Sequence, residues 1–447
     1  MSFNIALTGL SAVNDQLDTI SNNIANVGTT GFKSSRTEFG SIYSDSLAMG
    51  VEVLGKTQSI SKGGSLVSTG RELDLAISGG GFFITKASTG EVNYTRAGVF
   101  GTDKNNYIVN ASGQLLQGYA VDESNRLLAG AMTNLQLKAT NLPAEATSTL
   151  DFVANLDANE DVPTLTPFDP TKADSYNSTY TTKVFDSQGK EHTLTQYFVK
   201  TAANEWNAYY FVDGAAVESV TETPAGGTPT TTATTPATPP TPAIPAPITF
   251  TFNAAGQMTA PYDYARVLAN DPADPPQHVE ISFLADSAHL GGGVADMNIA
   301  MNYGGKGIGG VTQYGSSFVV NSNKPDGYSA GEQIGIAIEK DGMVYATYSN
   351  GQRQLQGQVA LANFTNLDGL RNVSGTAWVQ TAESGEPLVG VPGVGIFGDL
   401  SSGTLENSNV DLTQQLVTLM ESQRNYQANT KVLSTDKELT QVLFGAI

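Results

Sequence analysis

The sequence has no cysteine among its 447 residues, so no disulfide, thiolate metal site or cysteine nucleophile is possible. Long apolar runs are also missing. No stretch approaches the ~18 apolar residues that a membrane-spanning helix needs, and we expect no membrane insertion. The opening MSFNIALTGL lacks the basic and apolar regions of a secretory signal, so no cleaved signal peptide is expected.

Charged residues are scarce, at 15% of the chain, and basic ones are outnumbered by 43 acidic to 23, for a formal net charge of −20. Nucleic acids and anionic membranes need clustered Lys and Arg, so neither is expected as a partner. Solubility is the simpler meaning of the acidity. The 47 glycines, with frequent Thr, Val and Tyr, favour a β-rich body. The length predicts two to four domains.

Motifs of metal and nucleotide sites are weak. The three histidines, His192, His278 and His289, are scattered and lack metal-ligand spacing. Residues 305–310 match G-x-G-x-x-G, but the following VTQYG at 311–315 is not a helix start, which phosphate binding requires. We therefore expect no cofactor at these positions.

A calcium loop is similarly unsupported. Residues 157–161 begin like one, but Val162 stands where glycine is needed and Phe168 where a bidentate Glu belongs. No nucleophile-elbow motif supports a Ser-His-Asp triad. The expectation is no catalytic residue, no cofactor, no metal and no enzyme activity.

Apolar residues recur every three or four positions at the start of the chain, at Phe3, Ala6, Leu10, Val13, Leu17, Ile20, Ile24 and Val27. This is the a/d pattern of a coiled coil. A stripe so narrow needs a partner helix, because it cannot bury itself alone. Gly28 and Gly31 predict that the helix ends near residue 28.

The opposite end carries a second helical pattern. Residues 408–411 (SNVD) supply N-cap chemistry, and no Pro or Gly interrupts residues 411–444, which predicts a rod of ~45 Å. Its seam is polar at Gln423 and Thr430, which weakens a coiled coil but fixes register. We expect the two ends to pair with each other and with other subunits; the alternative is two amphipathic helices on one globular domain. The expected assembly residues are Phe3, Leu10, Val13, Leu17, Ile20, Ile24, Val27, Leu412, Leu416, Leu419, Gln423, Tyr426 and Leu433.

Between the ends, short apolar runs flank turn signals and predict hairpins at residues 74–85, 107–119 and 334–348. Eight prolines lie between Pro224 and Pro247, interleaved with Thr and Ala. Such a stretch is expected to form neither a strand ladder nor a packed helix. A surface loop at 221–249 is the main interpretation, and a Pro-rich ligand for another domain is the alternative.

Two long motifs resemble a known family. LDTISNNIANV at residues 17–27, continuing through TGFK at 30–33, resembles the N-terminal signature of bacterial flagellar axial proteins, the rod, hook and hook-associated subunits. SNVDL at 408–412, followed by ESQRNYQAN at 421–429, is similar to their C-terminal signature. Both motifs lie at the appropriate ends of the chain.

The interior favours the hook members of that family. DSQGKEH at 186–192, YFVK at 197–200 and NEW at 204–206 resemble their outer domain, as do YSNG at 348–351 and GQVALANF at 357–364. The distal rod subunit is the nearest alternative within the family. A soluble β-domain adhesin or binding protein is the alternative from another class.

The resemblance implies a mainly β body of two or more β-domains, one of them discontinuous, with long α-helices at both termini forming a coiled-coil core. The implied divisions are an N-terminal helix at 1–30, an extended connector at 31–70, a discontinuous β-domain at 71–145 plus 325–403, an inserted outer β-domain at 146–324, and a C-terminal helix at 404–447.

The resemblance also implies a function. Copies of the chain would polymerise into a hollow curved tube that acts as a universal joint and transmits torque from rod to filament. Implied partners are further copies of itself, the distal rod, the hook cap, the hook–filament junction protein and the flagellar type III export apparatus. The implied location is outside the cell, in the basal body and hook, after export without a cleaved signal peptide.

Overall fold

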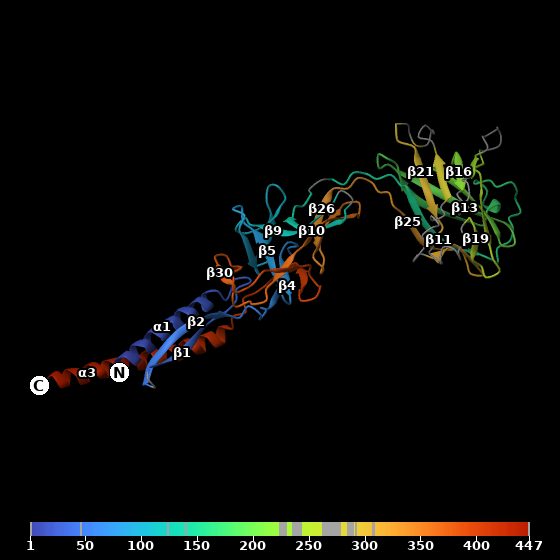
Figure 1. The fold of residues 1–447 in the computed structure, drawn as a ribbon. Coiled ribbons are helices and arrows are strands. Elements are labelled where there is room, and N and C mark those ends of the chain that lie inside the picture. The colour runs from blue at the N-terminus through green and yellow to red at the C-terminus, as the bar shows by residue number, and fades with distance from the viewer. Residues whose placement is uncertain are drawn as a thin grey trace. The chain divides into compact units, whose positions relative to one another are not determined.

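The computed structural model describes residues 2–44, 47–122, 125–138, 141–222, 230–234, 244–261, 279–283, 290, 293–305 and 309–445. The fold is mainly β, with one long helix near each end of the chain (Figure 1). It divides into two compact units. Unit 1 comprises Met1–Thr140 and Gln333–Ile447, and unit 2 comprises Asn141–Glu332.

The terminal helices α1 (Ser2–Ala25) and α3 (Leu412–Gly445) form where the apolar periodicity predicted them. Asp411 caps α3, since its Oδ1 accepts a hydrogen bond from the Gln414 amide at 3.1 Å. The absence of Pro and Gly before the last turn lets α3 run unbroken to Gly445.

The two helices lie side by side and run antiparallel. Asn23 Nδ2 donates to Gln415 Oε1 at 3.1 Å, and Gly9 approaches Asn429. Gly9 precedes Asn23 by fourteen residues on α1, and Asn429 follows Gln415 by fourteen on α3, so the two helices run in opposite directions. A long hairpin, β1 (Ser35–Ser44) and β2 (Leu47–Gln58), packs on α1. The hairpin occupies most of the segment that was expected to be an extended connector.

The β body of unit 1 draws on residues from both halves of the chain. Its main sheet has the strand order β26-β27-β28-β9-β5-β6-β31-β30, in which β9 pairs with β28 and so joins the early segment to the late one. Buried residues such as Phe83, Leu116, Val359, Leu361 and Leu400 share one core. The strands of the main path are β26 (Gln333–Ile338), β27 (Met343–Tyr348), β28 (Arg353–Val359), β9 (Leu115–Val121), β5 (Phe82–Lys86), β6 (Val92–Thr95), β31 (Ala377–Val379) and β30 (Arg371–Val373).

Shorter strands complete unit 1. Among them β3 pairs with β34 and β4 with β33, so the segment that precedes α3 is tied to the early part of the β body. These strands are β3 (Leu66–Ser68), β4 (Leu75–Ser78), β7 (Phe100–Thr102), β8 (Ile108–Asn110), β10 (Leu127–Asn134), β29 (Leu361–Asn363), β32 (Leu388–Gly390), β33 (Asp399–Ser402) and β34 (Thr404–Glu406).

Two of the three predicted hairpins are confirmed, at β8–β9 and β26–β27. The one predicted at residues 74–85 is wrong, because β4 pairs with β33 and β5 pairs with β6. The glycines between β4 and β5 do not make a tight turn. Gly79 and Gly81 have φ of 124° and 115°, and a Cβ on Gly79 would lie 3.0 Å from Gly398 Cα. They carry the chain past another segment into a different sheet.

Unit 2 is built from two sheets with a shared core. One has the order β17-β16-β20-β21-β11-β24 and the other β12-β13-β14-β18-β19. Side chains from both sheets, including Phe152, Phe198, Trp206, Phe250 and Tyr303, are fully buried together. In β13 burial alternates residue by residue, as expected for a strand with one face in a core.

The strands of unit 2 include one that contradicts an expectation. β17 (Thr230–Ala233) lies in the Pro/Thr-rich segment and pairs with β16, although no ladder was expected there. The four residues contain no proline, and three are threonines, which favour strands. The others are β11 (Thr149–Asp157), β12 (Ser178–Phe185), β13 (Glu191–Ala202), β14 (Glu205–Val212), β15 (Ala215–Ala216), β16 (Ser219–Glu222), β18 (Ile248–Phe252), β19 (Met258–Ala260), β20 (Val279–Phe283), β21 (Met297–Asn302), β22 (Gly304–Gly305), β23 (Gly309–Gly310), β24 (Thr312–Tyr314) and β25 (Val319–Pro325), with a short 3-10 helix at Ala173–Ser175.

Candidate assembly site at the paired ends of the chain

The two terminal helices approach each other through small side chains. A Cβ on Gly9 would lie 3.1 Å from Asn429 Nδ2, so the Asn429 side chain would have to shift to admit a larger residue there. Ala6 and Ala12 of α1 are buried, and Ser422 is buried on α3. The large apolar residues of the predicted seams are therefore not all used in this contact.

The thirteen predicted assembly residues fall into three groups. Val13 and Ile20 are buried. Half-buried are Leu10, Leu17, Ile24, Leu419 and Leu433. Exposed are Phe3, Val27, Leu412, Leu416, Gln423 and Tyr426. A single chain therefore leaves much of both seams without cover, and the coiled-coil core stays a prediction that involves further copies.

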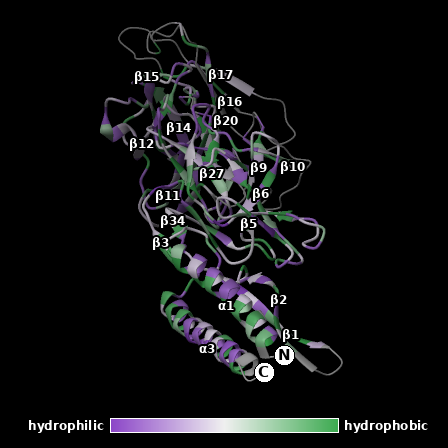
Figure 2. Ribbon diagram, turned by 90° about the vertical axis from the view of Figure 1, so that its left-hand side faces the viewer, coloured by the Kyte–Doolittle hydropathy of each residue, from purple (hydrophilic) through white to green (hydrophobic). Residues whose placement is uncertain are grey.

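One exposed apolar stripe follows α3. Leu412, Leu416 and Met420 are four residues apart and 42%, 45% and 51% exposed. The hairpin adds exposed Tyr43 and Leu54, and Figure 2 shows hydrophobic residues along α1 and the hairpin beside it. Because water disfavours exposed apolar side chains, these residues are candidates for an interaction site.

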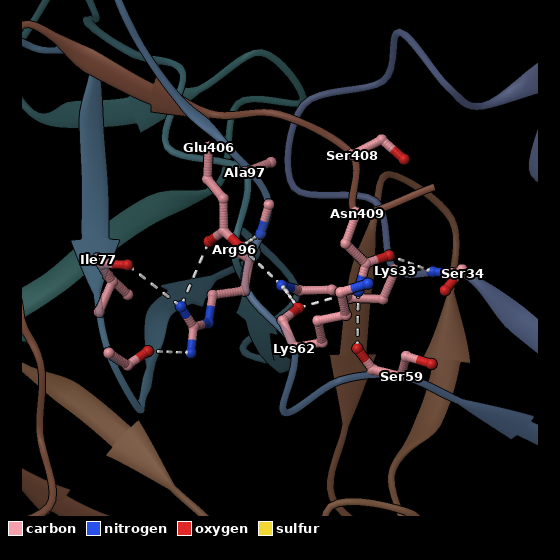
Figure 3. A network of polar contacts seen from close by, with 12 residues as sticks. Lys33, Ser34, Ser59, Lys62, Ile77, Arg96, Ala97, Glu406, Ser408 and Asn409 are labelled. Atoms are coloured by element: carbon pink, nitrogen blue, oxygen red, sulfur yellow. Dashed lines mark hydrogen bonds and ion pairs between the residues drawn. The ribbon is translucent and has the colours of Figure 1, made fainter. Parts of the chain in front are cut away.

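A buried ion cluster joins these ends to the β body (Figure 3). Lys33 Nζ lies 2.6 Å from Glu406 Oε1, and both side chains are 1% exposed. The Gly64 amide donates to the same oxygen at 2.9 Å. Burial lowers the pKa of the Lys33 amine, and the bond to Glu406 opposes that shift. The amine also donates to the Lys62 carbonyl at 2.8 Å, so its hydrogen bonds hold three segments together.

Arg96 of the β body completes the cluster. Its Nη1 lies 3.3 Å from Glu406 Oε2, and its Nη2 donates to the Gly79 carbonyl at 2.7 Å. The guanidinium lies 5.5 Å from the centre of the Phe82 ring. Burial lowers the pKa of Arg96, and Glu406 opposes that shift too. A single carboxylate thus serves two buried cations.

Amide side chains extend the cluster toward the helices. Asn409 Oδ1 accepts from the Ser34 amide at 2.7 Å, and its Nδ2 donates to the carbonyls of Ser59 and Lys62 at 2.8 and 2.9 Å. Asn23 of α1 bonds both the amide and the carbonyl of Ser35, at 2.9 and 2.8 Å. We call Asn23, Lys33, Arg96, Glu406 and Asn409 the junction network.

The junction network gives a physical role to signature residues. Asn23, Lys33 and Asn409 all lie in the motifs on which the family resemblance rests. Sequence reasoning assigned them no contact, and it missed Arg96 and Glu406 altogether. The sequence offered one signal for the cluster, which was the position of Lys33 directly after Gly31 and Phe32 in a chain with few charged residues.

The other candidate chemistry has a structural role in the described residues. His192 is buried, with Nδ1 2.7 Å from Asp213 Oδ2 and Nε2 3.2 Å from Asp186 Oδ2. The G-x-G-x-x-G match begins and ends in two paired strands, β22 and β23, rather than at a helix. His278 and His289 lie outside the described residues.

The described part of the chain holds no cluster of His, Asp and Glu suited to a metal ion. No helix in it combines the length and hydropathy needed to cross a membrane.

Four segments match families of flagellar proteins. Residues 3–33 match the flagella basal body rod protein family, and residues 76–150 match the flagellar hook protein FlgE/F/G D1 domain. Residues 155–328 match the flagellar basal body protein FlaE D2 domain, and residues 401–444 match the C-terminal region of the flagellar basal body rod FlgEFG proteins.

Similarity to individual proteins extends over nearly the whole chain. It is 36% identical to the flagellar hook protein FlgE of Escherichia coli over 99% of both chains. Identity to the flagellar hook protein FlgE of Salmonella typhimurium is 35%, again over 99% of both. With the flagellar hook protein FlgE of Rhizobium meliloti it is 34%, over 98% of this chain and 96% of that one.

Proposed function

The chain belongs to the flagellar hook protein family. We propose that it is a structural subunit of the hook and that it polymerises through α1, α3 and the β1–β2 hairpin. The observation that carries the proposal is the exposed apolar stripe Leu412, Leu416 and Met420 on a helix whose other face already packs on α1. Full burial of one such side chain is worth about 1.5–3 kcal/mol. Covering the exposed halves of three therefore contributes roughly 2–4 kcal/mol per subunit, before the rest of the seams is counted.

The junction network supports a mechanical part of this proposal. A buried ion cluster fixes the geometry of the segments that it joins, because each charged group is stable only with its partners in place. The helices would then be rigidly connected to the β body of unit 1 and would transmit load to it directly. A polymer of such subunits can act as a universal joint if inner contacts stay fixed while contacts of the outer domains lengthen and shorten around the curve.

The proposed setting follows from the family. A hook subunit would contact the distal rod at one end of the polymer, with the hook cap and the hook–filament junction protein at the other. It would reach this place, outside the cell, through the flagellar type III export apparatus without a cleaved signal peptide. Electron microscopy of the polymer purified from the wild-type chain should show a curved tube with a rigid inner wall.

The proposal is tested by substituting the stripe. Leu416→Asp should abolish polymerisation, measured by sedimentation and electron microscopy, because it places a charge in a contact that must be desolvated. Its thermal unfolding should be unchanged, since Leu416 is 45% exposed in the single chain. Ala203→Asp adds the same group in an exposed turn between β13 and β14 of unit 2, outside the terminal helices, and should polymerise normally. Filaments formed equally by both variants would refute the proposed role of α3.

A further inference from the structure

A groove lies between the hairpin and the two helices. It has a volume of about 610 Å³ and is lined by Ile5, Gly9 and Val13 of α1, by Phe39 and Tyr43 of the hairpin, and by α3 around Ala428. None of the lining residues is charged, in a chain with a net charge of −20. The lining also includes the polar side chains of Gln16, Ser41, Asn425 and Asn429, so the groove suits a mainly apolar occupant and disfavours a charged one.

The helix α3 continues beyond the part that α1 covers. Gly9 and Asn23 lie opposite Asn429 and Gln415, so Ser2 lies level with Asp436. The following residues, up to Gly445, extend roughly 13 Å further at ~1.5 Å per residue. We call residues 437–445 the α3 tip. Two of its apolar side chains, Leu439 and Val442, are 64% and 70% exposed.

The α3 tip continues the face of α3 that lines the groove. Leu439 follows Ala428 by eleven residues, which is three turns, and Val442 follows Leu439 by three more. A rigid antiparallel helix carries this face away from its own groove. Leu439 and Val442 therefore cannot be covered by the groove of their own chain.

We propose that the α3 tip of one copy inserts Leu439 and Val442 into the groove of the next copy. The inference rests on the proposed polymerisation through the terminal helices and names the contact that propagates it. The two surfaces are different, so the contact is head-to-tail, and it builds an open helical polymer when the rotation between successive copies does not close a ring. Because Val442 lies thirteen residues beyond Asn429, successive copies are displaced by about 20 Å along the helix axis.

Disulfide trapping tests the contact, and the chain has no cysteine to interfere. The variant Ile5→Cys/Val442→Cys pairs one groove residue with one tip residue, both exposed in the single chain. Oxidation of its polymer should give a ladder of covalent dimers, trimers and longer products. A mixture of the two single variants should stop at dimers, and each single variant alone should give none. Ser21→Cys/Val442→Cys, with one cysteine on α1 outside the groove, should also give none.

The outcomes separate this inference from the function on which it rests. Wild-type polymers with no ladder from Ile5→Cys/Val442→Cys overturn the tip-in-groove contact and leave polymerisation through the helices standing. Dimers from Val442→Cys alone overturn the head-to-tail arrangement. If the wild-type chain forms no polymer, the proposed function fails and the inference fails with it. In a second measurement, Val442→Asp should raise the critical concentration at least tenfold without changing thermal unfolding.

Discussion

Replacing Glu406 by Gln isolates the buried charge in the junction network. The substitution keeps the shape but removes the carboxylate that lies 2.6 Å from Lys33 and 3.3 Å from Arg96. Removing one partner of a buried ion pair costs about 3–5 kcal/mol, because a desolvated charge is left without compensation. For a unit of this size the melting temperature should fall by roughly 6–20 °C.

Tryptophan fluorescence can assign the loss to one unit. The chain has two tryptophans, and Trp378 lies in unit 1 while Trp206 lies in unit 2. Glu406→Gln should lower the transition reported by Trp378 and leave that reported by Trp206 in place. Single-tryptophan backgrounds, Trp206→Phe and Trp378→Phe, separate the two signals.

The matched control is the exposed pair Arg353–Glu339, which is 2.8 Å apart, with side chains 46% and 44% exposed. Glu339→Gln should cost under about 1 kcal/mol, because solvent screens the pair. Adding Lys33→Met to Glu406→Gln should recover part of the loss, since it removes one uncompensated cation. Equal losses from Glu406→Gln and Glu339→Gln would refute the role given to the cluster.

Two further predictions concern acid and backbone conformation. Burial alone would raise the pKa of Asp186, Asp213 and Asp326, but hydrogen bonds outweigh it and leave each pKa below the usual value. Their stabilisation is present above the unfolded value of about 3.9 and lost below it, so the Trp206 melting temperature should fall below about pH 4; a flat profile there would contradict this. Gly31→Ala should destabilise unit 1 by more than about 1 kcal/mol, because φ at Gly31 is +70° and the added Cβ would lie 2.5 Å from the Ala97 nitrogen. Gly28→Ala is the control and should not destabilise unit 1, because open space surrounds Gly28. Equal melting temperatures for the two variants would contradict the predicted strain at Gly31.

Local pattern was enough to predict the two helices. The spacing of apolar residues and the absence of Pro and Gly predicted both, and the cap Asp411 lies in the stretch 408–411 to which N-cap chemistry was assigned. Pairing between distant segments was not predictable in this way. The glycines at 79–81 looked like a turn, but their role depends on Gly398, more than three hundred residues later.

The assembly site was predicted only in part for a related reason. Periodicity shows which side chains share a helix face, but not which neighbour covers that face. The hairpin packs on α1 and buries Val13, while Leu416 on α3 stays exposed. The buried charges were missed because Lys33, Arg96 and Glu406 become informative only when the chain brings them together.

The two ends of the chain also set the order in which the molecule can mature. Unit 2 is one continuous segment of the chain. The ion pair of unit 1, in contrast, can form only after Glu406 is present, and Glu406 follows Lys33 by 373 residues. A chain emerging from its N-terminus can therefore complete unit 2 while unit 1 still lacks half of its core. The α3 part of the proposed assembly surface is consequently the last to appear, and an unfinished chain lacks it.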